Sequence, residues 1–360
     1  MYVNVAYYRE THIHLESGIA RVLPWLFDLV PVLRYLEPCL PRQMPYRMMR
    51  TLAPPLGEHS CMSYYEPSAL PLEYAVSRHL VTAPGELVHM FQGDAHFNYT
   101  AWLRHLPRRR RGALVVTFHQ PPERFEQIWG FRRKRARLSA IDQIVVTSTP
   151  SLEYFSDLVG EDRVALVPLG ANRRVFNPPS RNGAGREGEL RCLMVGSHLR
   201  DSALLRGTIE RVCSKNERAS FTVVSSQDFL DSLGEPPRTA KLHGISDDEL
   251  IAAYHAADLF LHPVKDAAAN TALIEAMSCG LPTVASDVGG VRDYADNSCA
   301  ELVKPGDPDA MADAILRLAA DPDRRHRLGA GADARSRAID WSQVADQLVQ
   351  VYGRALARRA

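Results

Sequence analysis

The chain has 360 residues, with 43 lysines and arginines against 42 aspartates and glutamates. This length suggests about two domains, and 46% hydrophobic with 24% charged residues is an ordinary globular composition, which excludes a fibre or a disordered chain. A formal net charge of +1 argues against a dedicated nucleic-acid-binding protein, because such proteins are usually strongly basic.

Short apolar runs alternate with helical patterns in both halves of the chain. In chain order they are Tyr2–Tyr8, Leu87–Phe91, Ala113–Phe118, Gln143–Ser148, Val164–Leu169, Arg191–Val195, Phe221–Val224, Asp258–His262, Pro282–Ser286 and Ala300–Val303. Runs rich in Val, Leu and Ile without polar alternation are typical of parallel strands covered by helices on both faces. The pattern predicts two Rossmann-like, doubly wound α/β domains that face each other across a cleft, with ligands beyond the carboxyl ends of the strands. Residues 29–80 give no clear strand signal.

A segment rich in Pro, Gly and charge, residues 177–189, predicts the linker between the two domains. The first domain is then 1–176 and the second 190–340. Residues 341–360 are predicted to form a carboxyl-terminal helix that can pack back on the first domain.

Two features bear on the compartment. The six cysteines have neither disulfide-framework nor metal spacing, and the start of the chain reads as a strand, so we expect a cytoplasmic protein with reduced thiols. The apolar stretches are too short for a membrane span. One basic run is interpreted as a solvated face, or alternatively as a peripheral contact with an anionic membrane. It comprises Arg132, Arg133, Lys134, Arg135 and Arg137.

The most informative segment is 266–294, directly after a predicted strand. Three alanines lead to Asn270, a good N-cap, and Thr271–Cys279 reads as a helix that ends at Gly280. Because only small residues crowd this helix start, its free N–H groups and its dipole can bind a diphosphate. Glu275 lies about one turn into the helix, where a carboxylate can accept hydrogen bonds from a ribose diol. The alternative is a solvated glutamate on an ordinary amphipathic helix.

This segment resembles the carboxyl-terminal signature of retaining glycosyltransferases of family 4, which have the GT-B fold. The shared features are an acid (Asp266), a small-residue turn, the helix, loop and strand of Leu273–Ser286, and Gly289–Gly290. Further matching segments are Val164–Pro178, Leu242–Leu250, Tyr254–Pro263, Glu301–Leu316 and Ala338–Tyr352. The resemblance covers about residues 113–352.

The resemblance implies transfer of a hexose from a nucleotide-diphosphate sugar to a hydroxyl acceptor, with retention of configuration. A UDP-sugar is the first choice of donor and GDP-mannose the second. The acceptor is a glycan, glycolipid or small molecule that the sequence does not identify. The resemblance implies no metal and no other cofactor. No nucleic-acid partner is expected.

The resemblance also assigns residues to the donor. Glu275 is implied to bind the ribose and Asp266 the hexose, while the loop containing His243 and Gly244 corresponds to the base-binding loop. The helix start would hold the diphosphate through Asn270, Thr271 and Ala272.

Two departures from the family pattern concern this donor site. Asp266 and Glu275 have eight residues between them, one more than the family's usual spacing. The family's phosphate-clamp lysine is missing, and Arg200 is its best replacement because a guanidinium binds phosphate in a bidentate way. The alternative for Arg200 is a salt bridge to Asp201 or to another acid.

In the first half of the chain, Ser17 and Gly18 resemble the family's glycine-rich turn, which approaches the donor phosphate and the acceptor. His119 ends a predicted strand, and a histidine at that place in the family contacts the donor sugar. His96 is a candidate for the acceptor pocket. For all four residues a purely structural role is the alternative. The family's implied mechanism is a front-face reaction in which the leaving diphosphate takes the acceptor's proton.

Other signals were weighed against this interpretation. The sequence Asp307-Pro308-Asp309 matches a metal-binding motif of other glycosyltransferases, but Asp307 and Asp321, each followed by proline, are predicted helix N-caps. Two rival functions stay open. One is a GT-B-fold sugar-nucleotide epimerase or phosphorylase, and the other is a non-catalytic nucleotide-sugar-binding protein.

Overall fold

The computed structural model describes residues 2–6, 32–35, 69–129, 134–179 and 189–359, together with single positions between 22 and 30. The chain clusters into two compact units. Among the described residues, the first unit holds those up to 168 together with 342–359, and the second holds 169–341.

The first unit is built on a six-stranded parallel sheet with the strand order β2-β1-β3-β4-β5-β6. Its strands are β1 (Tyr2–Ala6), β2 (Val32–Tyr35), β3 (Leu87–Met90), β4 (Ala113–Phe118), β5 (Gln143–Val146) and β6 (Val164–Leu166). Strands β3, β4 and β5 are buried along their whole length, as their continuous apolar runs predicted. Strand β2 was not predicted, because it falls in the part of the sequence without a strand signal.

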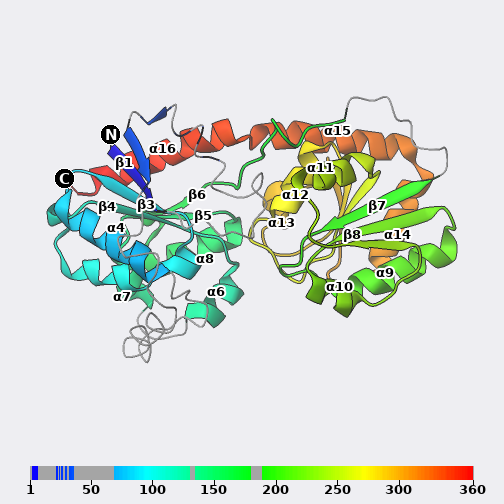
Figure 1. The fold of residues 1–360 in the computed structure, drawn as a ribbon, viewed down its shortest axis with the longest axis horizontal. Helices are drawn as coiled ribbons and strands as arrows, with labels where there is room; N and C mark the ends of the chain where they lie inside the picture. Colours follow the sequence, from blue (N-terminus) through cyan, green and yellow to red (C-terminus); the bar gives the residue numbers. More distant parts are fainter. Residues whose placement is uncertain are drawn as a thin grey trace. The chain divides into compact units, whose positions relative to one another are not determined.

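Helices cover both faces of this sheet (Figure 1). They are α4 (Leu70–Thr82), α5 (Gly93–His96), α6 (Pro122–Trp129), α7 (Lys134–Leu138), α8 (Thr149–Val159) and α16 (Trp341–Ala357), with short 3-10 turns η3 (Tyr99–His105), η4 (Arg108–Arg110) and η5 (Glu161–Arg163). One face packs an aromatic core in which Phe118 stacks on Phe155 and meets Phe125 edge-on. On the other face, Tyr352 of α16 lies 2.8 Å from Nδ1 of the buried His89, which ties the last helix to the first unit.

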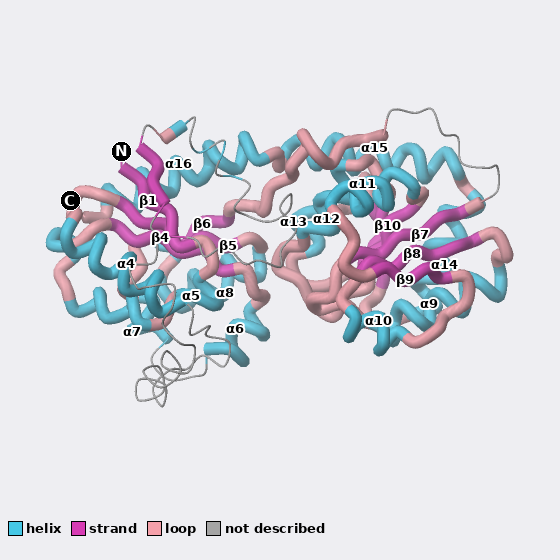
Figure 2. Tube along the Cα trace, in the orientation of Figure 1, coloured by secondary structure: helices cyan, strands magenta, loops and turns pink. Residues whose placement is uncertain are grey.

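The second unit is built on another six-stranded parallel sheet, with the order β12-β11-β10-β7-β8-β9. Figure 2 shows β10, β7, β8 and β9 side by side in this sheet. Its strands are β7 (Leu190–Val195), β8 (Ala219–Val224), β9 (Thr239–Leu242), β10 (Leu259–His262), β11 (Thr283–Ser286) and β12 (Ala300–Val303). Strand β9 was missed in the sequence because it is a half-exposed edge strand without an apolar run. The other five begin or end within two residues of the prediction.

The helices of the second unit are α9 (Ser202–Lys215), α10 (Gln227–Leu233), α11 (Asp247–Ala256), α12 (Thr271–Ser278), α13 (Val291–Tyr294), α14 (Pro308–Ala320) and α15 (Pro322–Ala338). One core contains side chains of α9, α10 and α14 together with Leu259 and Leu261 of β10. The predicted caps are confirmed, since Asp307 accepts from the N–H of Ala310 and Asp321 from that of Arg324, at 2.9 and 2.8 Å. A capping role for Asp307 replaces the metal-binding alternative.

The chain leaves the first unit between residues 168 and 169, which is earlier than the predicted boundary at 176. Contacts within the second unit explain the difference. The Leu169 N–H donates to the Tyr294 hydroxyl at 2.9 Å, and Ala171 pairs with Asp340. Phe176 packs edge-on against Tyr254. Residues 169–176 therefore belong to the second core, although their sequence follows the last strand of the first sheet.

Two parallel, helix-covered sheets confirm the predicted fold class of two Rossmann-like α/β domains. In such sheets all carboxyl ends meet at one edge, which is where ligand sites form.

Candidate functional site

The carboxyl edge of the second sheet brings together the residues that follow β7, β8 and β9. Ser225, after β8, donates its hydroxyl to the Gly196 carbonyl at 3.0 Å and accepts from His243 Nδ1 at its own carbonyl, also at 3.0 Å. His243 and Gly244 are exposed, and Gly244 has a φ of +64°, which favours glycine. The predicted base-binding loop therefore lies at the same edge as the turn after β7.

Helix α12 begins at this edge, after β10. Asn270 adopts an extended conformation and its Oδ1 accepts from the N–H of Leu273 at 3.2 Å, so the predicted N-cap is confirmed. The helix ends one residue earlier than predicted, and Gly280 follows with a φ of +72°. A capped start preceded by Ala267, Ala268 and Ala269 leaves the remaining first-turn N–H groups available to an anion.

Arg200 lies behind this helix start and is only 6% exposed. Its Nη2 donates to Asn270 Oδ1 at 2.9 Å and to the Val195 carbonyl at 2.7 Å. The alternative of a salt bridge to Asp201 is wrong, because the Asp201 carboxylate instead caps α9 by accepting from the Leu204 N–H at 3.0 Å. Burial lowers the pKa of Arg200 to about 10, which leaves the guanidinium charged at neutral pH.

Glu275 is 6% exposed, so the alternative of a solvated glutamate is wrong. Its Oε2 accepts from the Tyr254 hydroxyl of α11 at 2.9 Å, whereas Oε1 has no hydrogen-bond partner among the described residues. Burial raises the pKa of Glu275 to about 7, against the lowering effect of the Tyr254 hydrogen bond. A buried carboxylate oxygen without a donor is costly, and its place on α12 makes it a candidate ligand atom.

Asp266 opens the loop that leads to α12, and its Oδ1 accepts from the N–H of Ala267 at 2.7 Å. The side chain lies against the glycine pair. A Cβ at Gly289, which has a φ of +50°, would collide with Asp266 Oδ1 and with the Ala267 carbonyl. The N–H of Gly290 donates to that same carbonyl at 2.7 Å. The two glycines thus fix the loop that carries Asp266.

Two residues of this region were not predicted as functional. Tyr254 holds Glu275, as described above, and only its place inside a matching segment hinted at it. His262 is fully buried at the end of β10, and no residue in the described part of the chain hydrogen-bonds to either ring nitrogen. Burial and the nearby Arg200 charge lower the pKa of His262 well below its ordinary value, so the ring is neutral. The signal for His262 was its position as the last residue of an apolar run.

In the first unit, His119 follows β4 and is held by the backbone. Its Nε2 lies 2.7 Å from the Phe91 carbonyl and must carry the proton of that hydrogen bond, which leaves Nδ1 as an acceptor. The His119 N–H donates to Asp94 Oδ2 at 2.6 Å. His119 is therefore fixed in one ring orientation at the carboxyl end of β4, as a residue that contacts a ligand would be.

His96 occupies the last position of α5 and is 1% exposed, and burial lowers its pKa to about 4. This placement fits a structural role better than an acceptor contact. Ser17 and Gly18 lie outside the described residues.

The basic run is partly neutralised by the protein itself. Arg132 and Arg133 lie outside the described residues. Lys134 is buried and ion-paired with Glu126, and Arg137 donates to Asn98. Arg135 reaches the Asp157 carbonyl at 3.2 Å. The interpretation of this run as a uniformly solvated face is wrong for Lys134.

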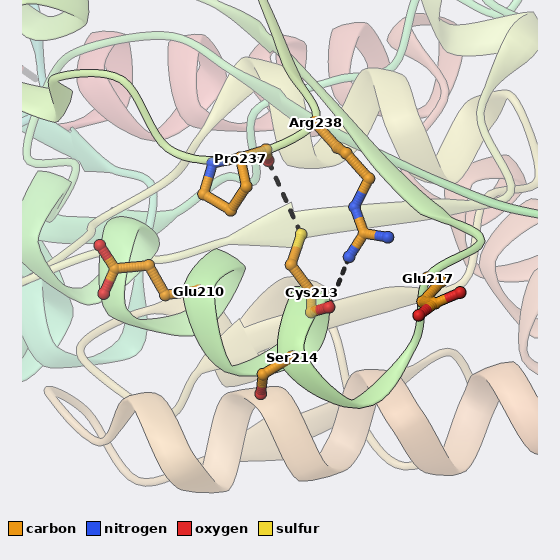
Figure 3. A pocket seen from close by; sticks show the side chains of 6 residues that line it. All are labelled: Glu210, Cys213, Ser214, Glu217, Pro237 and Arg238. Carbon is orange, nitrogen blue, oxygen red and sulfur yellow. Dashed lines mark hydrogen bonds between the residues drawn. The ribbon is translucent and has the colours of Figure 1, made fainter.

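A hollow of about 600 Å³ is present in the second unit, but away from these residues (Figure 3). It lies between the end of α9 and the segment before β9, at the amino edge of the sheet. The Arg238 guanidinium donates to the Cys213 carbonyl at 2.6 Å. This hydrogen bond joins the two segments that line the hollow. The hollow contains none of the predicted site residues.

Metal and membrane features were also sought in the described part of the chain. No group of three or more His, Cys, Asp or Glu side chains there is placed to hold a metal ion. No described helix combines the length and apolar character needed to cross a bilayer.

Comparison with known proteins matches much of the second unit to a described family. Residues 189–321 match the family model described as glycosyl transferases group 1. The chain is 32% identical over 284 residues to a D-inositol 3-phosphate glycosyltransferase of Frankia alni, covering 71% of this chain and 68% of the relative. It is 28% identical over 287 residues to an MMP alpha-(1->4)-mannosyltransferase of Mycolicibacterium hassiacum, covering 69% and 66%.

The fold is also found in a solved structure, an alpha,alpha-trehalose-phosphate synthase (UDP-forming) from Burkholderia vietnamiensis. It covers 99% of both chains with a TM-score of 0.73 at 16% identity, a likeness of fold alone. Three other curated relatives named D-inositol 3-phosphate glycosyltransferase are matched over 59%, 56% and 61% of their own length. The chain thus spans about three fifths of these relatives.

Proposed function

This chain belongs to the family of glycosyl transferases group 1, and we propose that it transfers a hexose from a nucleotide-diphosphate sugar to a hydroxyl group of an acceptor, with retention of configuration. The donor site is the carboxyl edge of the second sheet. The observation that carries the proposal is Glu275 Oε1, a buried carboxylate oxygen without a donor, on a helix whose capped start suits a diphosphate.

Glu275 is proposed to bind the donor ribose. One carboxylate oxygen is fixed by Tyr254, and a ribose hydroxyl would supply the hydrogen bond that Oε1 lacks. Hydrogen bonds to a charged group contribute about 1.5–3 kcal/mol each, so this contact would be a large part of donor affinity. The raised pKa makes the same carboxylate costly to ionise until a ligand arrives.

The diphosphate is proposed to lie at the start of α12, against the N–H groups of Thr271 and Ala272. During transfer, the bond between the anomeric carbon and the diphosphate oxygen breaks, and negative charge grows on that oxygen. The helix start and the buried Arg200 charge stabilise it. In a front-face reaction the acceptor oxygen bonds to the anomeric carbon from the same side. Its proton passes to the departing diphosphate, so no carboxylate is needed as a nucleophile.

Asp266 of the second unit and His119 of the first are each proposed to contact the hexose. Because His119 Nε2 donates to Phe91, Nδ1 can accept a hydrogen bond from a sugar hydroxyl. A UDP-sugar stays the preferred donor and is supported by the UDP-forming fold neighbour, while the mannosyltransferase relative supports GDP-mannose as the second choice. The acceptor is proposed only as a hydroxyl compound.

A thermal-shift screen against UDP-glucose, UDP-N-acetylglucosamine, UDP-galactose and GDP-mannose tests the proposal. We expect nucleotide sugars with one of the two bases, uracil or guanine, to raise the melting temperature of the wild type. The same compounds should not raise the melting temperature of Glu275→Gln. The matched control is Glu301→Gln on the edge strand β12, where the carboxylate pairs with Arg317 and Arg324. Stabilisation that survives Glu275→Gln, or is lost equally in Glu301→Gln, would contradict the ribose assignment.

Turnover separates the rival activities. Isomer formation from the nucleotide sugar without an acceptor would indicate an epimerase, and sugar 1-phosphate formed with inorganic phosphate would indicate a phosphorylase. Binding without acceptor-stimulated or hydrolytic release of the nucleotide would indicate a non-catalytic protein. The anomeric configuration of the product, measured by NMR coupling constants, tests retention.

A further inference from the structure

We propose that Arg200 is a positioning residue of this site: it holds the N-cap Asn270, and through it the first turn of α12, instead of contacting the diphosphate itself. The inference rests on the proposed function, because it explains how the diphosphate site is kept in place. It also replaces the sequence-based assignment of Arg200 as a direct phosphate clamp.

Four of the five N–H donors of the Arg200 guanidinium make hydrogen bonds to the protein. Nε and Nη2 donate to the Val195 carbonyl at 3.2 and 2.7 Å, and Nη1 donates to the His198 carbonyl at 3.3 Å. Nη2 also donates to Asn270 Oδ1 at 2.9 Å. All three nitrogens therefore face backbone or amide oxygens, and the side chain is 6% exposed. A residue that clamps a ligand directly would instead keep its fork open to solvent.

Asn270 Oδ1 is the shared atom of this arrangement. It accepts both from Arg200 and from the Leu273 N–H at 3.2 Å, which is the bond that caps α12. A carbonyl oxygen has two lone pairs, so both bonds can form at once and fix the amide plane. Without Arg200 the Asn270 side chain keeps the cap bond but loses the second contact that orients it.

The backbone on either side of Arg200 is joined to the loop before α12. Arg200 pairs with Val264 in an antiparallel bridge, the Asp201 N–H donates to the Pro263 carbonyl, and the Lys265 N–H donates to the Leu199 carbonyl, both at 2.9 Å. Leu199 has a φ of +55°, an unfavourable value for a branched side chain that the surrounding contacts must maintain. The turn after β7 and the loop after β10 are thus joined by backbone hydrogen bonds.

Gly196 makes room for this arrangement. It has a φ of +94°, and a Cβ there would lie 3.1 Å from Arg200 Nη2. Among the described residues no carboxylate influences the charge of Arg200, and His262 nearby is neutral. Arg200 therefore adds positive potential behind α12 while its hydrogen bonds go to the scaffold.

A double-mutant cycle tests the inference, with UDP as the probe and uridine as the ligand that lacks phosphates. We expect Arg200→Gln and Asn270→Ala each to weaken UDP binding about tenfold in calorimetry, and the double variant to be little weaker than either single one. Uridine affinity should change less than about twofold in all three. Because general damage to the second unit would weaken uridine as well, uridine separates positioning from a loss of structure.

Arg200→Lys is the second variant, and it replaces Arg200→Gln in the cycle if that protein does not fold. A single ammonium keeps the charge but cannot bridge Val195 and Asn270 in the same way, so we expect it to resemble Arg200→Gln. Wild-type UDP affinity in Arg200→Lys, or losses that multiply to about 100-fold in the double variant, would overturn the inference and leave the proposed function intact. A wild type that binds neither UDP nor GDP would overturn both.

Discussion

At the carboxyl edges of the two sheets, the proposed site residues differ in whether their polar atoms have partners within the protein. In the first unit, His119 donates to a backbone carbonyl, Asp94 accepts from the backbone, and His89 is held between Tyr352 and Thr117 at 2.8 Å each. In the second unit, Glu275 keeps one buried oxygen to which no described residue donates, and no described carboxylate influences Arg200.

Polar groups with partners in the protein stabilise the fold, whereas a buried polar group without a partner is a candidate to bind a ligand. A satisfied buried polar group lowers the cost of burial and orders the core, whereas an unsatisfied one costs free energy that only a ligand can recover. Glu275 therefore has the character of a ligand-binding residue, whereas His119 is oriented by the fold. The first edge also contains one buried atom without a described partner, Gln92 Oε1, which has no assigned role. The predictions below test that contrast.

Glu275→Ala should have the largest effect. It removes the carboxylate proposed to bind the ribose, so we expect donor affinity to fall by roughly 100-fold or more. Titration calorimetry with the nucleotide sugar found in the screen measures this, with Glu301→Ala as the control in the same unit. Unchanged donor affinity would remove Glu275 from the site and with it the contrast between the two edges.

The stability of the unliganded protein should depend on pH through Glu275. Its native pKa is raised to about 7 from the ordinary 4.5, so the folded state binds more protons between these values and the free energy of unfolding falls as pH rises through this window. The loss is at most about 3 kcal/mol between pH 4.5 and 8. Urea unfolding at several pH values measures it. The same pH slope in Glu275→Gln would assign the effect to other groups.

His119→Ala should leave nucleotide binding unchanged and lower kcat about 10- to 30-fold, because the sugar would lose one orienting hydrogen bond but keep the diphosphate and ribose contacts. Initial rates with saturating donor, together with the Kd of the nucleotide alone, check this. His105→Ala on the exposed surface of the same unit is the matched control. Full activity in His119→Ala would assign His119 to the fold alone.

Tyr352→Phe should have the smallest effect, and on stability only. It removes the hydroxyl that pairs with His89 Nδ1 and leaves that buried nitrogen without a partner, which costs about 1–2 kcal/mol. Chemical denaturation measures the change, and donor affinity should stay as in the wild type. A loss of donor affinity in Tyr352→Phe would show that the satisfied polar groups of the first unit also serve the second.

The sequence was informative wherever local patterns decide the structure. The continuous apolar run of β4 was predicted to the residue, since a fully covered strand is apolar along most of its length. The bounds of the edge strand β12 were also predicted, although Glu301 interrupts its apolar residues. The caps Asn270, Asp307 and Asp321 followed from residue type and from the proline after each aspartate, because an N-cap bond spans only three residues. The edge strand β9 was missed, because a half-exposed strand needs no apolar run.

By itself, then, the sequence determined the two parallel-sheet domains, the helix start at Asn270 and the choice of Glu275, all of which depend on neighbours in the chain. Only the tertiary structure decided that Tyr254 holds Glu275, that Arg200 turns toward Asn270 and away from Asp201, and that residues 169–176 join the second core. These contacts join segments far apart in sequence. Packing and burial decide which of several polar groups a side chain contacts, and a local sequence pattern carries no information about them.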